Sequence, residues 1–539
     1  MKYLKVLFLN SSSLFLFGLL SISACSQIKY PQKSKIVSFK DVHATEVILT
    51  AYTGIYERYI DQVSMEDIAI EGLRGLGSID PSLTIILANS EKNQHLIKNN
   101  QQRTKGVVIL QAEGTEVIRK LAPPPDDVVN WAALTTELSL AARKTSHELQ
   151  RTTMESYFEA VFDGALSNLD VFSRYSGADE ALEIRSKRDG FSGIGIEFKS
   201  HGIYPVIKKV LPGTPANLAD LQKGDLLTHI NGEELKGLKR KEISALLQGP
   251  IHSRIELTFI RPTISGSKTI VIERTQIFPN TITQNISKDV VVLKLKSFNQ
   301  NTAQSLLENL IEARNFLGKA MKGIIIDLRG NPGGLLKQSV KVADLLLTPG
   351  SIVSTRGRHT DSLNQYESGK KDFTFGLPLA VLVDGKSASA AEILAAALQD
   401  RNRAIIIGTT SFGKGSVQTV LRLPNEGEIT LTWSRLVTPS GYMFHGLGVR
   451  PQICTSGLHG DSIDIVKKVI SQSKKIKNVL LDWRKTSYED KLKRAQLRNS
   501  CPSQRRINDF ELSIAKQLIT NPALYKRALN LSANIKKGD

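Results

Sequence analysis

The stretch RAIIIGTTSFGKGSVQ, residues 403–418, decides how the second half of the chain is interpreted. An apolar, strand-like run leads into a glycine-rich loop that carries a single lysine, Lys414. Gly408, Gly413 and Lys414 match most of a nucleotide-binding P-loop, but that motif requires Ser or Thr after the lysine and then a helix. Gly415 stands there instead, and the residues SVQTVLRL that follow alternate and are β-branched, which predicts a strand. Lys414 therefore needs an explanation other than phosphate binding.

The stretch belongs to a region, 263–470, in which strands and amphipathic helices alternate. Apolar runs such as KGIIIDLR and PLAVLVDG are typical of buried strands, whereas TAQSLLENLIEARNFL and SAAEILAAALQD have helical periodicity. This alternation predicts an α/β core with a mostly parallel sheet. Ligands of such sheets bind in the loops that follow the strands.

The composition is that of a multidomain globular protein with an excess of basic residues. The 539 residues suffice for about three or four domains of ordinary size, and 41% of them are hydrophobic. The formal net charge of +19 would suit nucleic acid or an anionic membrane surface. No nucleic-acid-binding motif is present and the basic residues are spread along the chain, so a solvated cationic surface is favoured. No nucleic-acid partner is expected.

The first 25 residues predict a signal peptide and a lipid anchor. Lys2 and Lys5 precede an apolar stretch of signal-peptide length that ends in ISAC, residues 22–25. This ending resembles a bacterial lipobox, in which Cys25 is acylated and becomes the mature N-terminus. The alternative is an ordinary signal peptide or anchor helix with a chance cysteine. A short tether, 26–44, follows, and no later run approaches the ~20 apolar residues that a membrane span requires.

The expected location is the periplasmic side of a bacterial membrane. Ser26 stands after Cys25 where some lipoproteins of the inner membrane carry an acidic residue, so the outer membrane is favoured. In an oxidising compartment Cys454 and Cys501 could form a disulfide, although the sequence does not show that they are close. Three cysteines and nine scattered histidines give no metal-ligand spacing, so we expect neither a metal nor another cofactor.

Two regions outside the α/β core have helical patterns. Residues 45–175 are expected to be mainly helical, with a strand-containing insertion at about 82–125. Within this region FDGALSNLD echoes the earlier LRGLGSID, a weak internal repeat. Residues 471–539 are expected to form a basic helical extension. Neither the insertion nor the extension has a pattern that indicates chemistry.

Residues 185–262 change to short strands and glycine turns. The ordered segments FSGIGIEF, VIKKVLPGTPANLADLQKGDLLTHINGEEL, LKRKEISALLQG and SRIELTFIRP resemble a PDZ domain. The resemblance places the carboxylate-binding loop at four residues, Gly193, Ile194, Gly195 and Ile196. Such a loop turns backbone N–H groups toward the C-terminus of a captured protein or peptide. The alternative is a small β-domain that serves as a spacer.

Three strand-end loops of the α/β region hold residues suited to catalysis: DLRGNPGG at 327–334, KSASAAEILAAALQD at 386–400, and the Lys414 loop. Ser389 precedes an alanine-rich helix whose N-terminus offers free N–H groups and a positive dipole end, which suit an oxyanion. A serine there can be a nucleophile if a base removes its proton. No histidine lies in these loops, but a buried lysine can be that base because burial moves its pKa toward neutrality.

Each of these residues also has a purely structural interpretation. Ser389 and Glu392 have the spacing of a capping box, and spacing alone favours that role. Ser387 is a second possible nucleophile. Lys414 could be an ordinary surface cation.

The three loops, in this order behind a PDZ domain, resemble those of the carboxyl-terminal processing (tail-specific) protease family. The resemblance covers roughly residues 150–455, and the early helical segment is compatible with it. It implies a serine–lysine dyad in which Ser389 is the nucleophile and Lys414 the general base. It also implies that Gln418, four residues after the lysine, assists that base.

The resemblance further implies which groups surround the dyad. The oxyanion hole would use the backbone N–H of Ala390 and one from the glycine loop, Gly333 or Gly334. Asp400, at the end of the helix, would be a supporting residue with a structural role.

The function implied is that of a PDZ-gated serine endopeptidase that recognises the C-termini of exported proteins. The alternative is an inactive, lipid-anchored PDZ scaffold or adaptor. A degenerate enzyme would be expected to lose Ser389, Lys414 or Gln418, and all three are present. The sequence leaves the natural substrates and the oligomeric state open.

Overall fold

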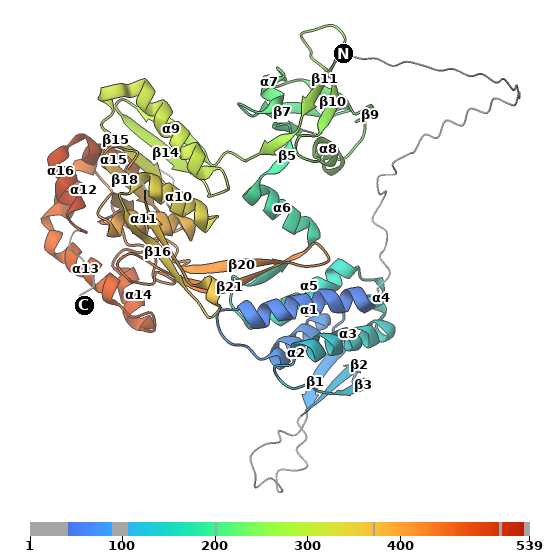
Figure 1. Ribbon diagram of the computed structural model, residues 1–539. Coiled ribbons are helices and arrows are strands. Elements are labelled where there is room, and N and C mark those ends of the chain that lie inside the picture. Colours follow the sequence, from blue (N-terminus) through green and yellow to red (C-terminus); the bar gives the residue numbers. More distant parts are fainter. Residues whose placement is uncertain (1–40, 89–105, 200–201, 370–371, 506–508, 533–539) are drawn as a thin grey trace, which may run out of the picture.

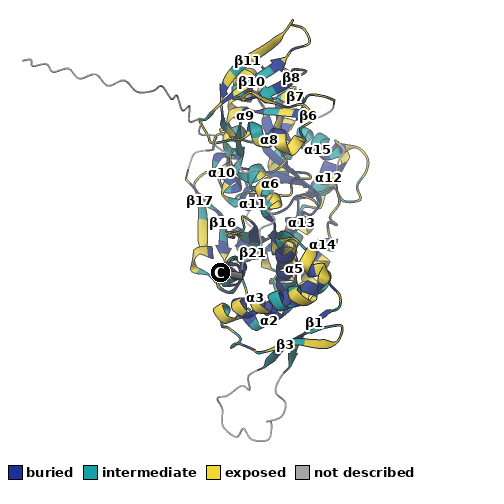
Figure 2. Cartoon of the chain, turned by 90° about the vertical axis from the view of Figure 1, so that its right-hand side faces the viewer, coloured by how far each residue is buried: buried dark blue, intermediate teal, exposed yellow. Residues whose placement is uncertain are grey.

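A computed structural model describes five stretches of the chain: 41–88, 106–199, 202–369, 372–505 and 509–532. The predicted signal peptide with Cys25, and nearly all of the predicted tether, lie outside the described residues. Figure 1 shows the N-terminal helices at one end of the molecule, the strand-rich domain of residues 185–262 at the other, and the α/β core to one side. The turned view in Figure 2 shows the same elongated arrangement.

The N-terminal unit is a group of helices with a small sheet at its outer edge. Its helices are α1 (Asp41–Arg58), α2 (Met65–Arg74), α3 (Val128–Thr145), α4 (His147–Arg151) and α5 (Met154–Leu166). Its antiparallel sheet consists of β1 (Leu83–Ala88), β2 (Val107–Ala112) and β3 (Thr115–Leu121). The insertion expected at about 82–125 therefore does contain strands. Trp131, Tyr52 and Phe158 are among the buried side chains of this unit.

The two segments that echo each other in sequence pack together in this unit. Gly75 and Gly164 hold matching positions in them, at the ends of α2 and α5. A Cβ on Gly164 would lie 2.3 Å from the carbonyl oxygen of Glu71 and 3.0 Å from the Cα of Gly75. The helices therefore cross where neither has room for a side chain.

The strand-rich domain is an antiparallel sheet in the order β11-β10-β8-β7-β6. Its strands are β6 (Ile196–Lys199), β7 (Val206–Val210), β8 (Leu226–Ile230), β10 (Arg254–Ile260) and β11 (Ser267–Glu273), with β9 (Glu233–Glu234) paired to β8. Because β11 lies in this sheet, the domain extends past residue 262, where the sequence pattern placed its end. Helix α8 (Arg240–Leu247) buries Ile243 and Leu247 against it, as the pattern LKRKEISALLQG predicts. A two-stranded ribbon of β5 (Phe191–Gly193) and β12 (Thr275–Ile277) joins the domain to the core.

The core is a six-stranded sheet in the order β13-β14-β15-β18-β19-β22. Its strands are β13 (Ile282–Ser287), β14 (Val290–Leu295), β15 (Gly323–Asp327), β18 (Leu379–Val383), β19 (Ile405–Gly408) and β22 (Ile453–Cys454). Only the β13–β14 pair is antiparallel among these described strands. The mostly parallel sheet expected from the alternating pattern is therefore confirmed.

Helices cover both faces of this sheet. One face packs against α9 (Thr302–Leu317), α10 (Leu336–Leu346) and α11 (Ala390–Asp400). The other packs against α12 (Ser462–Ser471), α15 (Phe510–Thr520) and α16 (Pro522–Leu529). Two of these last three helices belong to the basic extension, which also contains α13 (Ser473–Lys485) and α14 (Lys491–Asn499). The extension thus completes the hydrophobic core of the α/β unit.

A second sheet connects the core to the N-terminal unit. Its strands are β16 (Gly350–Arg356), β17 (Asn364–Ser368), β20 (Ser416–Arg422) and β21 (Glu428–Val437), in the order β17-β16-β21-β20. The short strand β4 (Arg174–Ser176) pairs with β21, and helix α6 (Ala178–Asp189) continues from β4 toward the strand-rich domain (Figure 1). Because β20 follows the Lys414 loop, the predicted strand is found where a P-loop would have a helix.

Buried ion pairs and a disulfide fasten the extension. Arg329, in the first of the three loops, pairs with Asp327 at 2.9 Å and with Glu511 of α15 at 3.1 Å. Cys454 and Cys501 form a disulfide, which answers the question that the sequence left open. In the part of the chain that the structure describes, no helix combines the length and apolar character needed to cross a membrane.

Candidate active site

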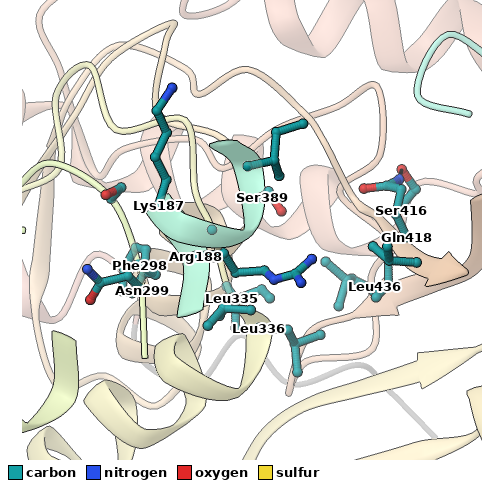
Figure 3. Close-up of a pocket in the computed structure, with 16 residues that line it drawn as sticks. Lys187, Arg188, Phe298, Asn299, Leu335, Leu336, Ser389, Ser416, Gln418 and Leu436 are labelled. Carbon is teal, nitrogen blue, oxygen red and sulfur yellow. Dashed lines mark hydrogen bonds between the residues drawn. The ribbon is translucent and has the colours of Figure 1, made fainter. Parts of the chain in front are cut away.

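Ser389 lies at the N-terminus of α11, directly after the loop that follows β18. Its backbone has φ +54° and ψ −115°, a conformation that residues with a side chain rarely adopt and that is typical of constrained functional positions. The side chain of Ser389 lines a cavity of about 480 Å³ (Figure 3). Ser389 is therefore accessible at the end of a parallel strand, where the sheet is expected to bind a ligand.

Ser387, the second possible nucleophile, is not in that cavity. It is fully buried, and its hydroxyl donates to the carbonyl oxygen of Leu328 at 2.8 Å. The same hydroxyl accepts the backbone N–H of Asp384 at 2.9 Å. These bonds fix the loop before Ser389, so Ser387 has a structural role.

The cavity beside Ser389 is mostly apolar. It is lined by Phe298, Leu335, Leu336, Ile393, Val417, Val420 and Leu436, and by the polar or charged Lys187, Arg188, Asn299, Ser416 and Gln418, among others. Lys187 and Arg188 come from α6, the helix that leads to the strand-rich domain (Figure 3). The cavity can therefore accept an extended chain with apolar side chains, next to the hydroxyl of Ser389.

The glycine loop after β15 packs directly against Ser389. A Cβ on Gly333 would lie 2.8 Å from the Cβ of Ser389 and 3.0 Å from the backbone nitrogen of Ala390. A Cβ on Gly334 would lie 2.1 Å from the carbonyl oxygen of Phe298. Only glycine fits at either position, and both have positive φ, +102° and +140°.

The backbone N–H groups around Ser389 differ in their availability. That of Gly333 donates to the side-chain oxygen of Asn331 at 2.8 Å. Among the described residues, no acceptor is found for the N–H of Gly334 or for that of Ala390. The pair Ala390 and Gly334 is thus free to bind an oxyanion, whereas Gly333 is already occupied.

Lys414 is half-buried, and its amine lies 4.6 Å from the centre of the Phe172 ring. Burial lowers the pKa of this amine, and the positive charge of Arg174 lowers it further, while the carboxylates of Asp170 and Glu392 oppose the shift. Lys414 is therefore not an ordinary surface cation. Among the described contacts there is no hydrogen bond between its amine and the hydroxyl of Ser389.

Gln418 contacts neighbouring hydroxyl groups. Its amide donates to Ser416 at 3.0 Å and to Thr432 at 3.2 Å, and no bond from Gln418 to Lys414 is found among the described residues. Gln418 shares the cavity with Ser389, on the opposite side of the view in Figure 3 from Lys187.

Glu392 connects the two loops. Its fully buried carboxylate accepts the backbone N–H groups of Ser389 and Lys414 at one oxygen, Oε2, each at 2.8 Å. The other oxygen accepts the N–H of Gly413 at 2.7 Å and the hydroxyl of Ser411. The four hydrogen bonds favour the carboxylate and lower the pKa of Glu392. Burial has the larger effect and raises that pKa to about 7. The capping-box spacing predicted only the bond to Ser389.

Asp400 has the structural role that was expected. Its carboxylate pairs with Arg484 of α13 at 2.9 Å and accepts the backbone N–H of Ser440 at 3.0 Å. It thereby fixes the end of α11 to the extension. No group of three or more His, Cys, Asp or Glu side chains in the described ranges is placed to bind a metal ion.

The GIGI segment lines a second, smaller cavity of about 220 Å³, in the strand-rich domain. The opposite wall is α8, with Arg240, Ser244 and Leu247. No described residue accepts the backbone N–H of Ile194 or that of Gly195. Ile194 and Gly195 therefore present free donors to a cavity whose opposite wall carries both the polar Arg240 and Ser244 and the apolar Leu247.

Comparison with known proteins agrees with both units. Residues 289–455 match the model of peptidase family S41, and residues 206–261 match the model of a PDZ domain. The chain thus combines a PDZ domain with a serine-type peptidase core.

Individual proteins of similar sequence identify the family within these peptidases. The carboxy-terminal-processing protease of Bartonella bacilliformis is 36% identical over 301 residues, which are 56% of this chain and 69% of that protein. A probable CtpA-like serine protease of Staphylococcus epidermidis is 29% identical over 339 residues, 61% of this chain and 67% of that protein. The solved photosystem II D1 C-terminal processing protease is 27% identical, with a TM-score of 0.34, over 58% of this chain and 85% of that one. The chain belongs to the family of carboxy-terminal-processing proteases.

Proposed function

We propose that the protein is a serine endopeptidase in which Ser389 is the nucleophile and Lys414 the general base. The observation that carries the proposal is the pair of bonds to Glu392 Oε2: two backbone nitrogens, each 2.8 Å from one oxygen, are necessarily close to each other. The serine and lysine loops are therefore locked together. We propose that a change of side-chain rotamer at Lys414 brings its amine from Phe172 to the Ser389 hydroxyl.

The chemistry follows from the groups present. Lys414, in the neutral form that burial favours over the ammonium form, takes the hydroxyl proton as the oxygen of Ser389 bonds to the scissile carbonyl carbon. The oxyanion that forms accepts the N–H groups of Ala390 and Gly334. Lys414 then gives the proton to the leaving amine as the C–N bond breaks. Water hydrolyses the acyl-enzyme through the same groups. Gln418 would orient the amine of Lys414 once that amine has turned toward the cavity.

We further propose that the PDZ domain captures substrates by their C-termini. The free N–H groups of Ile194 and Gly195 suit a terminal carboxylate, and the apolar surface of Leu247 suits an apolar last side chain. The mostly apolar cavity beside Ser389 favours substrates with apolar residues near the cleaved bond.

The test is digestion of an unfolded protein by the chain without residues 1–25. We expect wild type to produce fragments and Ser389→Ala to produce none, while both bind a C-terminal peptide equally. Equal digestion by both would contradict the assignment of the nucleophile.

The position of the Lys414 amine over the Phe172 ring supports a second candidate, a non-cleaving PDZ scaffold whose lysine stays there. In that case neither wild type nor Ser389→Ala digests the unfolded protein, and peptide binding alone remains.

For the location, we propose a lipoprotein on the periplasmic side of a bacterial membrane, on the basis of ISAC at 22–25. Cys25→Ser should block processing or release the protein from membranes. Normal processing together with membrane retention of that variant would argue against the anchor.

A further inference from the structure

The segment 498–504 of the C-terminal extension lies against the loop that leads to Lys414. It comprises the last two residues of α14 and the five that follow, and the disulfide between Cys454 and Cys501 fastens it to the end of β22. The match to peptidase family S41 ends at residue 455, so the segment lies outside the matched region. No pattern in the sequence indicated a role for it.

Reciprocal hydrogen bonds join the segment to the first residues of the loop. The hydroxyl of Thr410 donates to the carbonyl oxygen of Cys501 at 2.6 Å. The hydroxyl of Ser503 donates to the carbonyl oxygen of Thr410, also at 2.6 Å. The hydroxyl of Thr409 donates to the carbonyl oxygen of Gln504 at 2.9 Å and accepts the N–H of Gln504 at 3.1 Å. Thr409 and Thr410 are fully buried, and the bond from Thr410 to Cys501 is shielded from water.

Arg498 extends the attachment to the middle of the loop. One arm of its guanidinium donates to the carbonyl oxygens of Ser411 at 3.2 Å and Leu447 at 2.8 Å. The other arm donates to the hydroxyl of Ser503 at 2.8 Å. A rigid fork with several donors is suited to hold three chain segments in one arrangement. A Cβ on Gly448 would lie 3.0 Å from Arg498 Nη1, so the fork fits closely.

Glu392 holds the same loop from the other side. Ser411 is where the two supports meet, because its hydroxyl donates to Glu392 while its carbonyl oxygen accepts from Arg498. The hydroxyl of Ser411 also accepts the N–H of Val449 at 2.7 Å. Lys414 follows three residues later, so its position depends on both supports.

The disulfide restricts the freedom of the segment. It links residues 47 positions apart, and closing a chain of that length removes many of the conformations in which the segment would leave the loop. Cys501 is fully buried between the core and the loop. The covalent link and the hydrogen bonds therefore act on the same contact.

We propose that residues 498–504, fastened by the Cys454–Cys501 disulfide, position the Lys414 loop for catalysis, and that Arg498 and Ser503 are the positioning residues. The inference rests on the proposed function, because it assigns these residues to the lysine of that reaction. It gives the extension a role in turnover in addition to its part in the core.

The experiment compares wild type, Arg498→Ala, Arg498→Lys, Ser503→Ala and the double change of Cys454 and Cys501 to serine. Arg527→Ala is the matched control, since Arg527 is an exposed arginine of the same extension, on α16. Three quantities are measured on each protein: hydrogen exchange of the backbone amides of 409–415, and kcat and KM for an unfolded substrate. Melting temperatures verify that each protein is folded.

We expect faster exchange in the loop and a kcat that is lower by roughly tenfold or more in Arg498→Ala, with KM unchanged, because small misplacement of a catalytic group is costly. Arg498→Lys keeps the charge without the fork and should be intermediate. The double serine variant should resemble Arg498→Ala, and Arg527→Ala should resemble wild type. Ser503 is an exposed residue, so Ser503→Ala should fold and keeps the test valid if Arg498→Ala does not fold.

If hydrogen exchange in the 409–415 loop is unchanged in both Arg498→Ala and Ser503→Ala, the claim that the segment holds the loop is contradicted, regardless of kcat. Faster exchange with a wild-type kcat would overturn the role in positioning. Failure of the proposed function is recognised separately, because either wild type would not cleave or Ser389→Ala would cleave as well as wild type. If wild type does not cleave, the catalytic part of this inference is overturned too.

Discussion

Glu392 and Lys414 are 22 residues apart in the chain, and a hydrogen bond of 2.8 Å joins the backbone N–H of Lys414 to Glu392 Oε2. The same oxygen accepts the N–H of Ser389. One buried carboxylate thus joins the loop of Ser389 to the loop of Lys414 through their backbones. In the proposed mechanism, the side chain of Lys414 turns while its backbone stays in place.

The raised pKa of Glu392 predicts a change of stability with pH. Its pKa is about 7 in the folded chain, above its ordinary value of 4.5, because burial disfavours the carboxylate. The folded state then holds the proton more tightly than the unfolded state. The contribution of Glu392 to the free energy of unfolding is therefore present below about pH 4.5 and is lost as pH rises through about 7.

Glu392→Gln tests this, since glutamine keeps the shape and does not titrate. The difference in melting temperature between wild type and Glu392→Gln should shrink as pH rises from 5 to 7 and stay constant above 8. A difference that is constant or grows over that interval would show that the folded chain does not hold the proton as expected.

Ser387 and Ser389 should respond differently to alanine. Ser387→Ala removes a hydroxyl that both donates and accepts within a buried loop, so we expect a loss of about 1–3 kcal/mol in the free energy of unfolding. Activity per folded molecule should stay substantial. Ser389→Ala should keep its stability and lose cleavage. Denaturant unfolding and a cleavage assay on the same preparations separate the two effects, and an inactive, stable Ser387→Ala would reverse the assignment.

Capture of a C-terminus should depend on its negative charge. A peptide with an apolar last residue and a free carboxylate should bind the Ser389→Ala protein more tightly than the same peptide with an amide end, by roughly 10- to 100-fold in Kd, because a hydrogen bond to a charged group contributes more than one to a neutral group. Calorimetric titration of both peptides measures the ratio. Equal affinities would mean that the N–H groups of Ile194 and Gly195 do not hold the carboxylate.

Gly195→Asp, which would place a negative charge beside the bound carboxylate, is unsuited to this test. Gly195 has φ +88°, and a Cβ there would lie 2.3 Å from Thr214. Any side chain would disturb the domain itself, so weaker binding by that variant would not report on charge.

The sequence predicted the parts of the fold that depend on local patterns. Each strand and helix quoted from the α/β region forms, because period-2 and period-3.6 runs of apolar residues specify a face to bury. The role of the extension was not predicted, because a helix pattern does not show what the helix covers. Glu511 pairs with Arg329 across 182 residues, and no local pattern could indicate that contact.

In the candidate active site, too, local sequence patterns predicted some of the contacts and not others. Ser389, Ala390 and the two glycines are next to one another because short loops at the ends of neighbouring strands bring them together. The amine of Lys414 lies over Phe172, a contact between segments 242 positions apart that local sequence could not indicate. Gln418 bonds to hydroxyl groups of its own sheet, so its assistance to Lys414 stays a prediction.

The most direct test of the central claim is the rate of acyl-enzyme formation as a function of pH in wild type and in Lys414→Arg and Lys414→Met. Burial lowers the pKa of Lys414 below its ordinary 10.5, and only the neutral amine can take the proton of Ser389. The wild-type rate should therefore rise with pH to a plateau whose midpoint is below 10.5. Arginine stays charged and methionine has no base, so both variants should fold, bind C-terminal peptides and form no acyl-enzyme. A near-wild-type rate in Lys414→Arg would contradict the serine–lysine mechanism.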